Sequence, residues 1–133
     1  FSETELELNM YTPIPSLALS ILKDLKMETG NEPFVFYKQN KRSDTITEAS
    51  IRHAIQNISG KGLTPFGWLG TFKTWSHSTG YPQSLLEVYF HQSAFLNLSI
   101  TERQEMYRQT RVMLNHWQDY LMGDAKVTER ARL

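Results

Sequence analysis

The nine residues 64–72, "TPFGWLGTF", decide how the chain is interpreted. A Thr followed by Pro is typical of the start of a helix, where Pro fits the first helical position. The pattern predicts a helix over about 67–79 that stops at Gly80. Three aromatic side chains crowd its first turns. The stretch is therefore either ordinary core or the frame of a catalytic motif whose chemical groups have been replaced.

The remaining pattern predicts a mainly helical domain with a small β element. Leucine and isoleucine at helical spacing indicate a helix over 16–29, and Pro82 begins another that runs through "QSLLEVYFHQ". Thr45-x-x-Glu48 and Ser99-x-x-Glu102 are capping-box patterns for helices over 47–58 and 100–121. The last helix carries one apolar stripe, formed by Met106, Met113, Leu114, Trp117, Tyr120 and Leu121. Short strands are expected at 7–14 and 34–37, followed by a polar loop over 38–46.

Length and composition exclude several classes of protein. A chain of 133 residues is long enough for one domain with a core, expected over 1–122 with a frayed tail at 123–133. There is no cysteine, and no apolar run is long enough to cross a membrane, which favours a cytoplasmic protein with no membrane partner. The net charge of zero argues against strong non-specific nucleic-acid binding. The chain opens on Phe1, and we interpret it as a piece of a longer protein.

The order of these elements carries a family resemblance. The segment "TPIP" leads into "LALSILKDLKMETG", then "FVF", a basic loop, the helix "ITEASIRHAIQNI" and the closing helix "RVMLNHWQDYL". This order resembles the catalytic domain of phage-type integrases, the tyrosine recombinases, over about residues 8–122. The resemblance implies an integrase-like fold from a mobile element, DNA as the partner, and DNA integration by strand breakage and rejoining. No cofactor is implied.

The family's chemistry depends on a few groups around one phosphate. A Tyr attacks the phosphodiester, two Arg stabilise the developing charge, and a Lys and His residues move protons. This sequence departs from that set: Phe66 and Leu69 stand where the family has His-x-x-Arg, and the Tyr position falls near Thr101. No Tyr occurs between Gln92 and Met106, "FSETELELNMYT" lacks the Lys, and the first Arg would lie upstream of Phe1. His91 is the one match to a catalytic position. The resemblance thus implies a degenerate active site, and we expect Phe66 or Leu69 to be buried against Leu85, Leu86 and Tyr89 or near Val35.

Other side chains offer weaker candidates. A local excess of cations could follow a DNA backbone or be a solvated loop; it consists of Lys38, Lys41, Arg42, Arg52 and Lys61. The three tryptophans, Trp68, Trp75 and Trp117, fit packing better than base stacking. Tyr107 lies inside a strong helical pattern, which disfavours it as a displaced nucleophile. The four His residues lack ligand spacing, so no metal is expected.

Three functions remain open at this point. The first is an inactive integrase-like domain with residual DNA-binding or regulatory function, whose partners are DNA, weakly bound, and itself or another integrase. The second is an active recombinase completed by upstream residues. The third is a protein–protein interaction module on an integrase-like fold.

Overall fold

The computed structural model describes residues 11–38, 40–60 and 62–123. These residues are mainly helical with one small two-stranded sheet, which confirms the predicted class. The chain divides into two compact units, one formed by residues 17–72 and the other by residues 73–133 together with 1–16. Two such units can belong to one domain, so the predicted domain over 1–122 stays a prediction.

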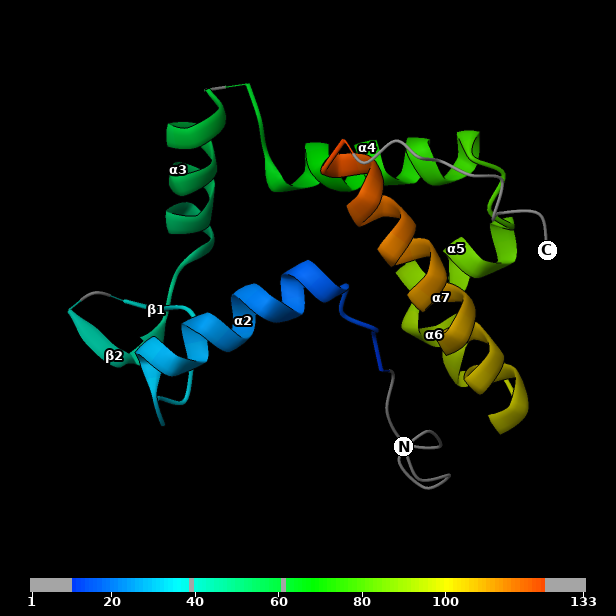
Figure 1. Ribbon diagram of the computed structural model, residues 1–133, viewed down its shortest axis with the longest axis horizontal. Coiled ribbons are helices and arrows are strands. Elements are labelled where there is room, and N and C mark those ends of the chain that lie inside the picture. Colours follow the sequence, from blue (N-terminus) through cyan, green and yellow to red (C-terminus); the bar gives the residue numbers. More distant parts are fainter. Residues whose placement is uncertain (1–10, 39, 61, 124–133) are drawn as a thin grey trace. The chain divides into compact units, whose positions relative to one another are not determined.

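The unit of residues 17–72 contains three helical segments and the sheet. Helix α2 (Ser16–Thr29) is followed by β1 (Tyr37–Lys38) and β2 (Lys41–Thr45), then by α3 (Glu48–Ser59) and the first half of α4 (Pro65–Ser78). Figure 1 shows the two strands between the end of α2 and the start of α3. Helix α2 has the predicted bounds. Its end is marked by Gly30, whose φ of 63° suits a residue without a side chain.

The strands differ from the prediction. The polar loop expected over 38–46 is wrong, because Lys41–Thr45 forms β2 and pairs antiparallel with β1. Tyr37 lies opposite Thr45 and Lys38 opposite Lys41, with an irregular register between the two pairs. Polar composition did not prevent the strand because hairpin pairing satisfies its backbone groups. Of the strand expected at 34–37, only Tyr37 is in a strand, and residues 11–14 of the expected first strand have no regular structure. Residues 7–10 lie outside the described residues.

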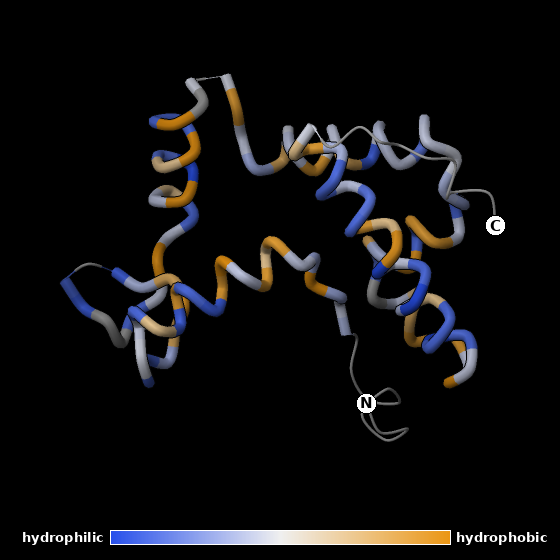
Figure 2. The backbone as a smooth tube through the Cα atoms, viewed as in Figure 1, coloured by the Kyte–Doolittle hydropathy of each residue, from blue (hydrophilic) through white to orange (hydrophobic). Residues whose placement is uncertain are grey.

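The start of α3 also corrects the sequence interpretation. Thr45 belongs to β2, and Thr47 is the N-cap, whose hydroxyl accepts a hydrogen bond from the Ser50 amide at 3.2 Å. The predicted Thr45–Glu48 capping box is therefore wrong, although the helix begins within one residue of the expected position. Figure 2 shows the apolar residues that recur along α3. Ile58 on this helix is 86% exposed.

Helix α4 begins two residues earlier than predicted. The Thr64 hydroxyl accepts from the Gly67 amide at 3.0 Å, and Pro65 occupies the first helical position, where a missing N–H costs nothing. Gly80, with φ of 88°, follows the end of the helix as expected.

The second unit holds the core. It includes the end of α4, then α5 (Gln83–Phe90), α6 (Gln92–Leu96) and α7 (Ile100–Leu121). The helix predicted from Pro82 is interrupted at His91, whose extended backbone separates α5 from α6. Among the described residues, the buried large apolar side chains lie in this unit, apart from Phe72 just before it; they are Trp75, Leu85, Leu86, Val88, Phe95, Met113 and Leu114.

Helix α7 is the best predicted element. Its bounds agree with the sequence, and the Ser99–Glu102 capping box is present, with the Glu102 carboxylate accepting from the Ser99 amide at 2.8 Å. Of the predicted stripe, Met113 and Leu114 are buried, whereas Tyr120 and Leu121 are exposed. The stripe therefore holds in the middle of the helix and ends before its last turn.

Trp75 gathers an aromatic cluster at the end of α4. Its ring lies 4.9 Å from that of Trp117 and 5.0 Å from that of His116, and it also contacts Tyr81 and Tyr120. The Tyr81 hydroxyl and His116 Nδ1 lie 2.9 Å apart, within hydrogen-bonding distance. This cluster joins α4 to α7. It confirms that Trp75 and Trp117 pack; Trp68 is 51% exposed.

Candidate functional site

The two motif positions on α4 are exposed, which overturns the expectation of a closed site. Phe66 is 77% exposed and Leu69 is 45% exposed. Helical spacing explains Phe66: Trp75 and the buried Phe72 share one side of α4, and Phe66 lies well away from it. The positions where the family places its His and Arg therefore form an open, uncharged surface in the first turns of α4.

His91 and Thr101 stand at two further positions that the resemblance assigns to the active site. His91 is exposed and lies between α5 and α6, where its amide donates to the Glu87 carbonyl at 2.9 Å. Thr101 is exposed in the first turn of α7. A Thr hydroxyl is a weak nucleophile unless a base activates it. Neither residue has a catalytic partner at the Phe66 or Leu69 position, because those side chains cannot donate or accept a proton.

Two tyrosines of the second unit, Tyr89 and Tyr107, are half-buried. Tyr107 and Tyr89 line a cavity of about 10 Å³, together with Tyr11 and Thr110. That volume is close to the space that one water molecule needs. Burial raises the pKa of the Tyr89 phenol, which disfavours a phenolate. The cavity itself is too small to hold a DNA phosphate.

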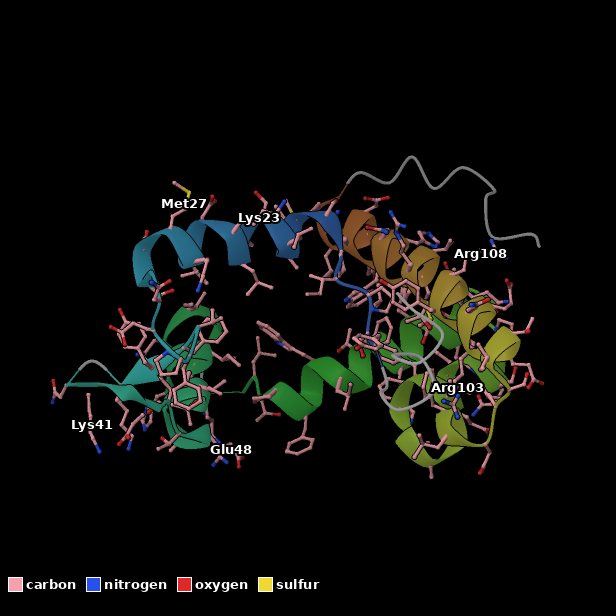
Figure 3. The ribbon with its side chains drawn as sticks, turned by 90° about the horizontal axis from the view of Figure 1, so that it is seen from below. Lys23, Met27, Lys41, Glu48, Arg103 and Arg108 are labelled. Carbon is pink, nitrogen blue, oxygen red and sulfur yellow. The ribbon has the colours of Figure 1, made fainter. Side chains whose placement is uncertain are left out.

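Arg103 is a buried cation on α7 that the sequence analysis did not single out. Its Nε donates to the Leu98 carbonyl at 3.0 Å and its Nη2 to the Leu96 carbonyl at 2.8 Å. The guanidinium also lies over the Phe95 ring, 5.1 Å from the ring centre. Arg103, labelled in Figure 3, therefore holds the turn between α6 and α7. These contacts are structural and leave it poorly suited to a phosphate clamp.

The basic stretch is partly neutralised by its own acids. Asp44 forms ion pairs with two lysines: Lys41 Nζ lies 3.2 Å and Lys38 Nζ 3.6 Å from its carboxylate. Arg52 pairs with Glu48 at 3.0 Å on the first turns of α3. Figure 3 shows Lys41 on the hairpin and Glu48 at the start of α3. All of these side chains except that of Asp44 are exposed.

The structure tests the remaining candidates only in part. The Arg42 side chain and Lys61 lie outside the described residues. Within residues 11–38, 40–60 and 62–123, no three His, Cys, Asp or Glu side chains come together as a group that could hold a metal ion. In the same ranges, no helix combines the length and hydrophobicity needed to cross a membrane.

Sequence reasoning missed Arg103 and the Tyr81–His116 pair. The Tyr81–His116 pair joins residues that are distant in the sequence, and Arg103 contacts backbone carbonyls; no side-chain motif reveals either. The one available signal was an Arg four residues after the N-cap Ser99, on the side of α7 that also carries Thr110.

In comparisons with known proteins, no family model, curated protein or solved structure matches this chain.

Proposed function

We propose that this chain is an integrase-like catalytic domain from a mobile element, which no longer breaks DNA and keeps a weak DNA-binding or regulatory role. Its setting would be the cytoplasm, and its partners DNA and either itself or another integrase. The order of the helices α2, α3, α4 and α7 supports the proposal. Helix α4 begins within two residues of the place where the resemblance expects the motif helix, and α7 has the expected bounds.

One observation carries the loss of activity. The motif positions lie on an exposed surface of α4, as side chains that meet DNA must, but Phe66 and Leu69 occupy them. Neither can stabilise the charge that grows on a phosphate in the transition state. Removing a single such donor from an enzyme costs about 10²–10³ in rate. Loss of the Arg, the His and the Tyr together leaves no route to a phosphotyrosine.

The hairpin and the start of α3 are the proposed DNA contact. Over residues 38–61 the sequence has five Lys and Arg against two acids, and the Lys and Arg side chains of the ion pairs there are exposed. Exposed pairs contribute little, about 0–1 kcal/mol, so the cations can exchange a carboxylate for a phosphate. With about two or three phosphates neutralised, affinity should fall roughly 10–40-fold between about 50 and 200 mM salt.

The catalytic claim is tested with nicked duplexes of random sequence, which trap covalent protein–DNA adducts. We expect no adduct with the wild-type chain. An adduct that survives denaturation would overturn the claim and support an active recombinase completed by another chain. Tyr107→Phe and Thr101→Ala identify the attacking residue in that case, because the adduct disappears only in the variant that lacks it.

The binding claim is tested by titrating the chain with duplex DNA at the two salt concentrations. Lys41→Glu should weaken binding and lower the salt slope. Arg111→Glu, an exposed substitution on α7, is the matched control and should change both less. Equal effects of the two variants would show that the hairpin is not the contact.

A second candidate, the protein–protein interaction module, is favoured by exposed apolar side chains in residues 17–72. Large apolar side chains at least 39% exposed occur on each of its helices and in the segment before β1; they include Ile21, Met27, Phe36, Ile58 and Phe66. Exposed large apolar side chains are more typical of protein interfaces than of DNA contacts. If the chain does not bind DNA at either salt concentration, the result would favour this second candidate.

A further inference from the structure

Two lysines of the β1–β2 hairpin lie opposite each other. Lys38 on β1 and Lys41 on β2 are register partners, so the pairing of the two strands brings two positive charges to one place. Both side chains are exposed, and Lys41 is labelled in Figure 3. Like charges directly opposite each other on paired strands are destabilising. The hairpin is therefore stabilised by an anion that contacts both lysines.

The Asp44 carboxylate supplies this anion. Lys41 Nζ lies 3.2 Å from Asp44 Oδ1, and Lys38 Nζ lies 3.6 Å from Asp44 Oδ2, so each oxygen contacts one lysine. The Asp44 side chain is 35% exposed, which is less than either lysine side chain, at 47% for Lys38 and 66% for Lys41. Asp44 thus bridges two ammonium groups that come from different strands.

A DNA phosphate has the same requirements as this carboxylate. A phosphodiester carries one negative charge on two non-bridging oxygens, and lysine ammonium groups are common ligands of such oxygens. The two ion pairs are exposed, so each contributes little to stability and can be exchanged for a contact with phosphate. The carboxylate stays close to both lysines, however, because Asp44 lies on β2 itself. A phosphate that binds here is attracted by the lysines and repelled by Asp44.

We propose that Asp44 is an intramolecular competitor of the DNA phosphate, which occupies the anion site of Lys38 and Lys41 and limits the affinity of the hairpin for DNA. The inference rests on the proposed function, which supplies DNA as the ligand. Two unit charges about 4 Å apart in water interact strongly enough to change an equilibrium about fivefold. Asp44 therefore lowers the affinity by about that factor at low salt, and by less when salt screens the charges.

Asp44→Asn tests the competition, because it removes the charge and keeps the shape of the side chain. We expect this variant to bind a short DNA duplex about fivefold more tightly than wild type at about 50 mM salt. Glu48→Gln is the matched control. It removes the same charge from the same region, but Glu48 is 73% exposed and pairs with a single cation, Arg52. Its affinity should change less than twofold, and equal gains in the two variants would overturn the proposal.

A second pair of variants tests the bridge. In a chain that carries Lys38→Gln, a phosphate can approach Lys41 from the side away from Asp44. Adding Asp44→Asn to that chain should then tighten binding less than twofold, and an undiminished gain would contradict the bridging role. The amide resonances of Tyr37 and Thr45, which are register partners, show by NMR that the hairpin is formed in each variant.

Inorganic pyrophosphate decides the case in which no chain binds DNA. It offers phosphate oxygens without a duplex, and its binding is followed by the amide resonances of Lys38 and Lys41. If these resonances shift at a several-fold lower pyrophosphate concentration in Asp44→Asn than in wild type, the anion site stands although the DNA-binding function has failed. If the two chains respond equally, the competition is overturned as well. Equal binding of DNA by wild type and Asp44→Asn overturns the competition and leaves the DNA-binding function in place.

Discussion

Replacing Arg103 by Met separates a structural arginine from one that clamps a phosphate. Met keeps the apolar stem and removes the guanidinium, which donates to the Leu98 carbonyl at 3.0 Å and to the Leu96 carbonyl at 2.8 Å. Hydrogen bonds to charged groups contribute about 1.5–3 kcal/mol each. The stacking on Phe95 adds about 0.5–1 kcal/mol.

The expected loss is smaller than that sum. Leu96 is 46% exposed, so water can hydrate its carbonyl once the guanidinium is removed. In addition, the variant has no desolvation cost for a buried charge. We therefore expect a fall of about 2–3 kcal/mol in the free energy of unfolding. For a unit of this size, that corresponds to a fall of roughly 8–24 °C in Tm.

Urea unfolding measures this change. Trp75 and Trp117 lie in the same unit as Arg103 and report on its packing by fluorescence. Arg111→Met, at an exposed arginine on the same helix, is the control and should stay within about 0.5 kcal/mol of wild type. A change below about 0.5 kcal/mol in Arg103→Met, or a lower salt slope of DNA binding with unchanged stability, would refute the structural role.

Leu69→Arg should change the free energy of unfolding by less than about 0.5 kcal/mol, because Leu69 is 45% exposed, and Tm should stay nearly the same. A large fall in Tm in a thermal melt would mean that the position is buried in solution. The pKa of Glu105 is lowered to about 2 by hydrogen bonds from Arg108 and Gln109. Because the folded pKa lies below the unfolded value of 4.5, Glu105 contributes stability above pH 4.5 that is lost as the pH falls towards 2. Glu105→Gln should flatten this part of the pH–stability curve, and an identical curve would show that the interaction is absent. Ser99→Ala removes one half of the capping box on α7 and should cost about 1 kcal/mol in urea unfolding, while Ser93→Ala, also exposed, should cost less.

Local signals in the sequence were enough for the starts of α4 and α7. Ser99 and Glu102 satisfy the first amides of α7 by contacts within one turn, so the helix start is readable from four letters. Thr64 and Pro65 act in the same way for α4. Gly30 and Gly80 take positive φ values at helix ends, where residues with a side chain are strained.

The pairing of β1 with β2 could not be predicted from local sequence signals. The polar letters of Lys41–Thr45 indicate a loop, and only the antiparallel partner at Tyr37–Lys38 makes them a strand. The sequence pattern indicates Thr45 as a helix cap, but in the structure Thr45 belongs to β2 and lies opposite Tyr37. The competition between a local cap and a strand is decided by hydrogen bonds to residues several positions away.

The candidate site shows the same division. The sequence by itself determined that Phe66 and Leu69 stand at the motif positions and that no Tyr lies between Gln92 and Met106, because these are facts of residue order. Only the tertiary structure decided that Phe66 and Leu69 are exposed and that the Arg103 guanidinium donates hydrogen bonds to backbone carbonyls. The physical reason is that helical spacing fixes which residues share a face, whereas burial depends on what other segments of the chain pack against that face.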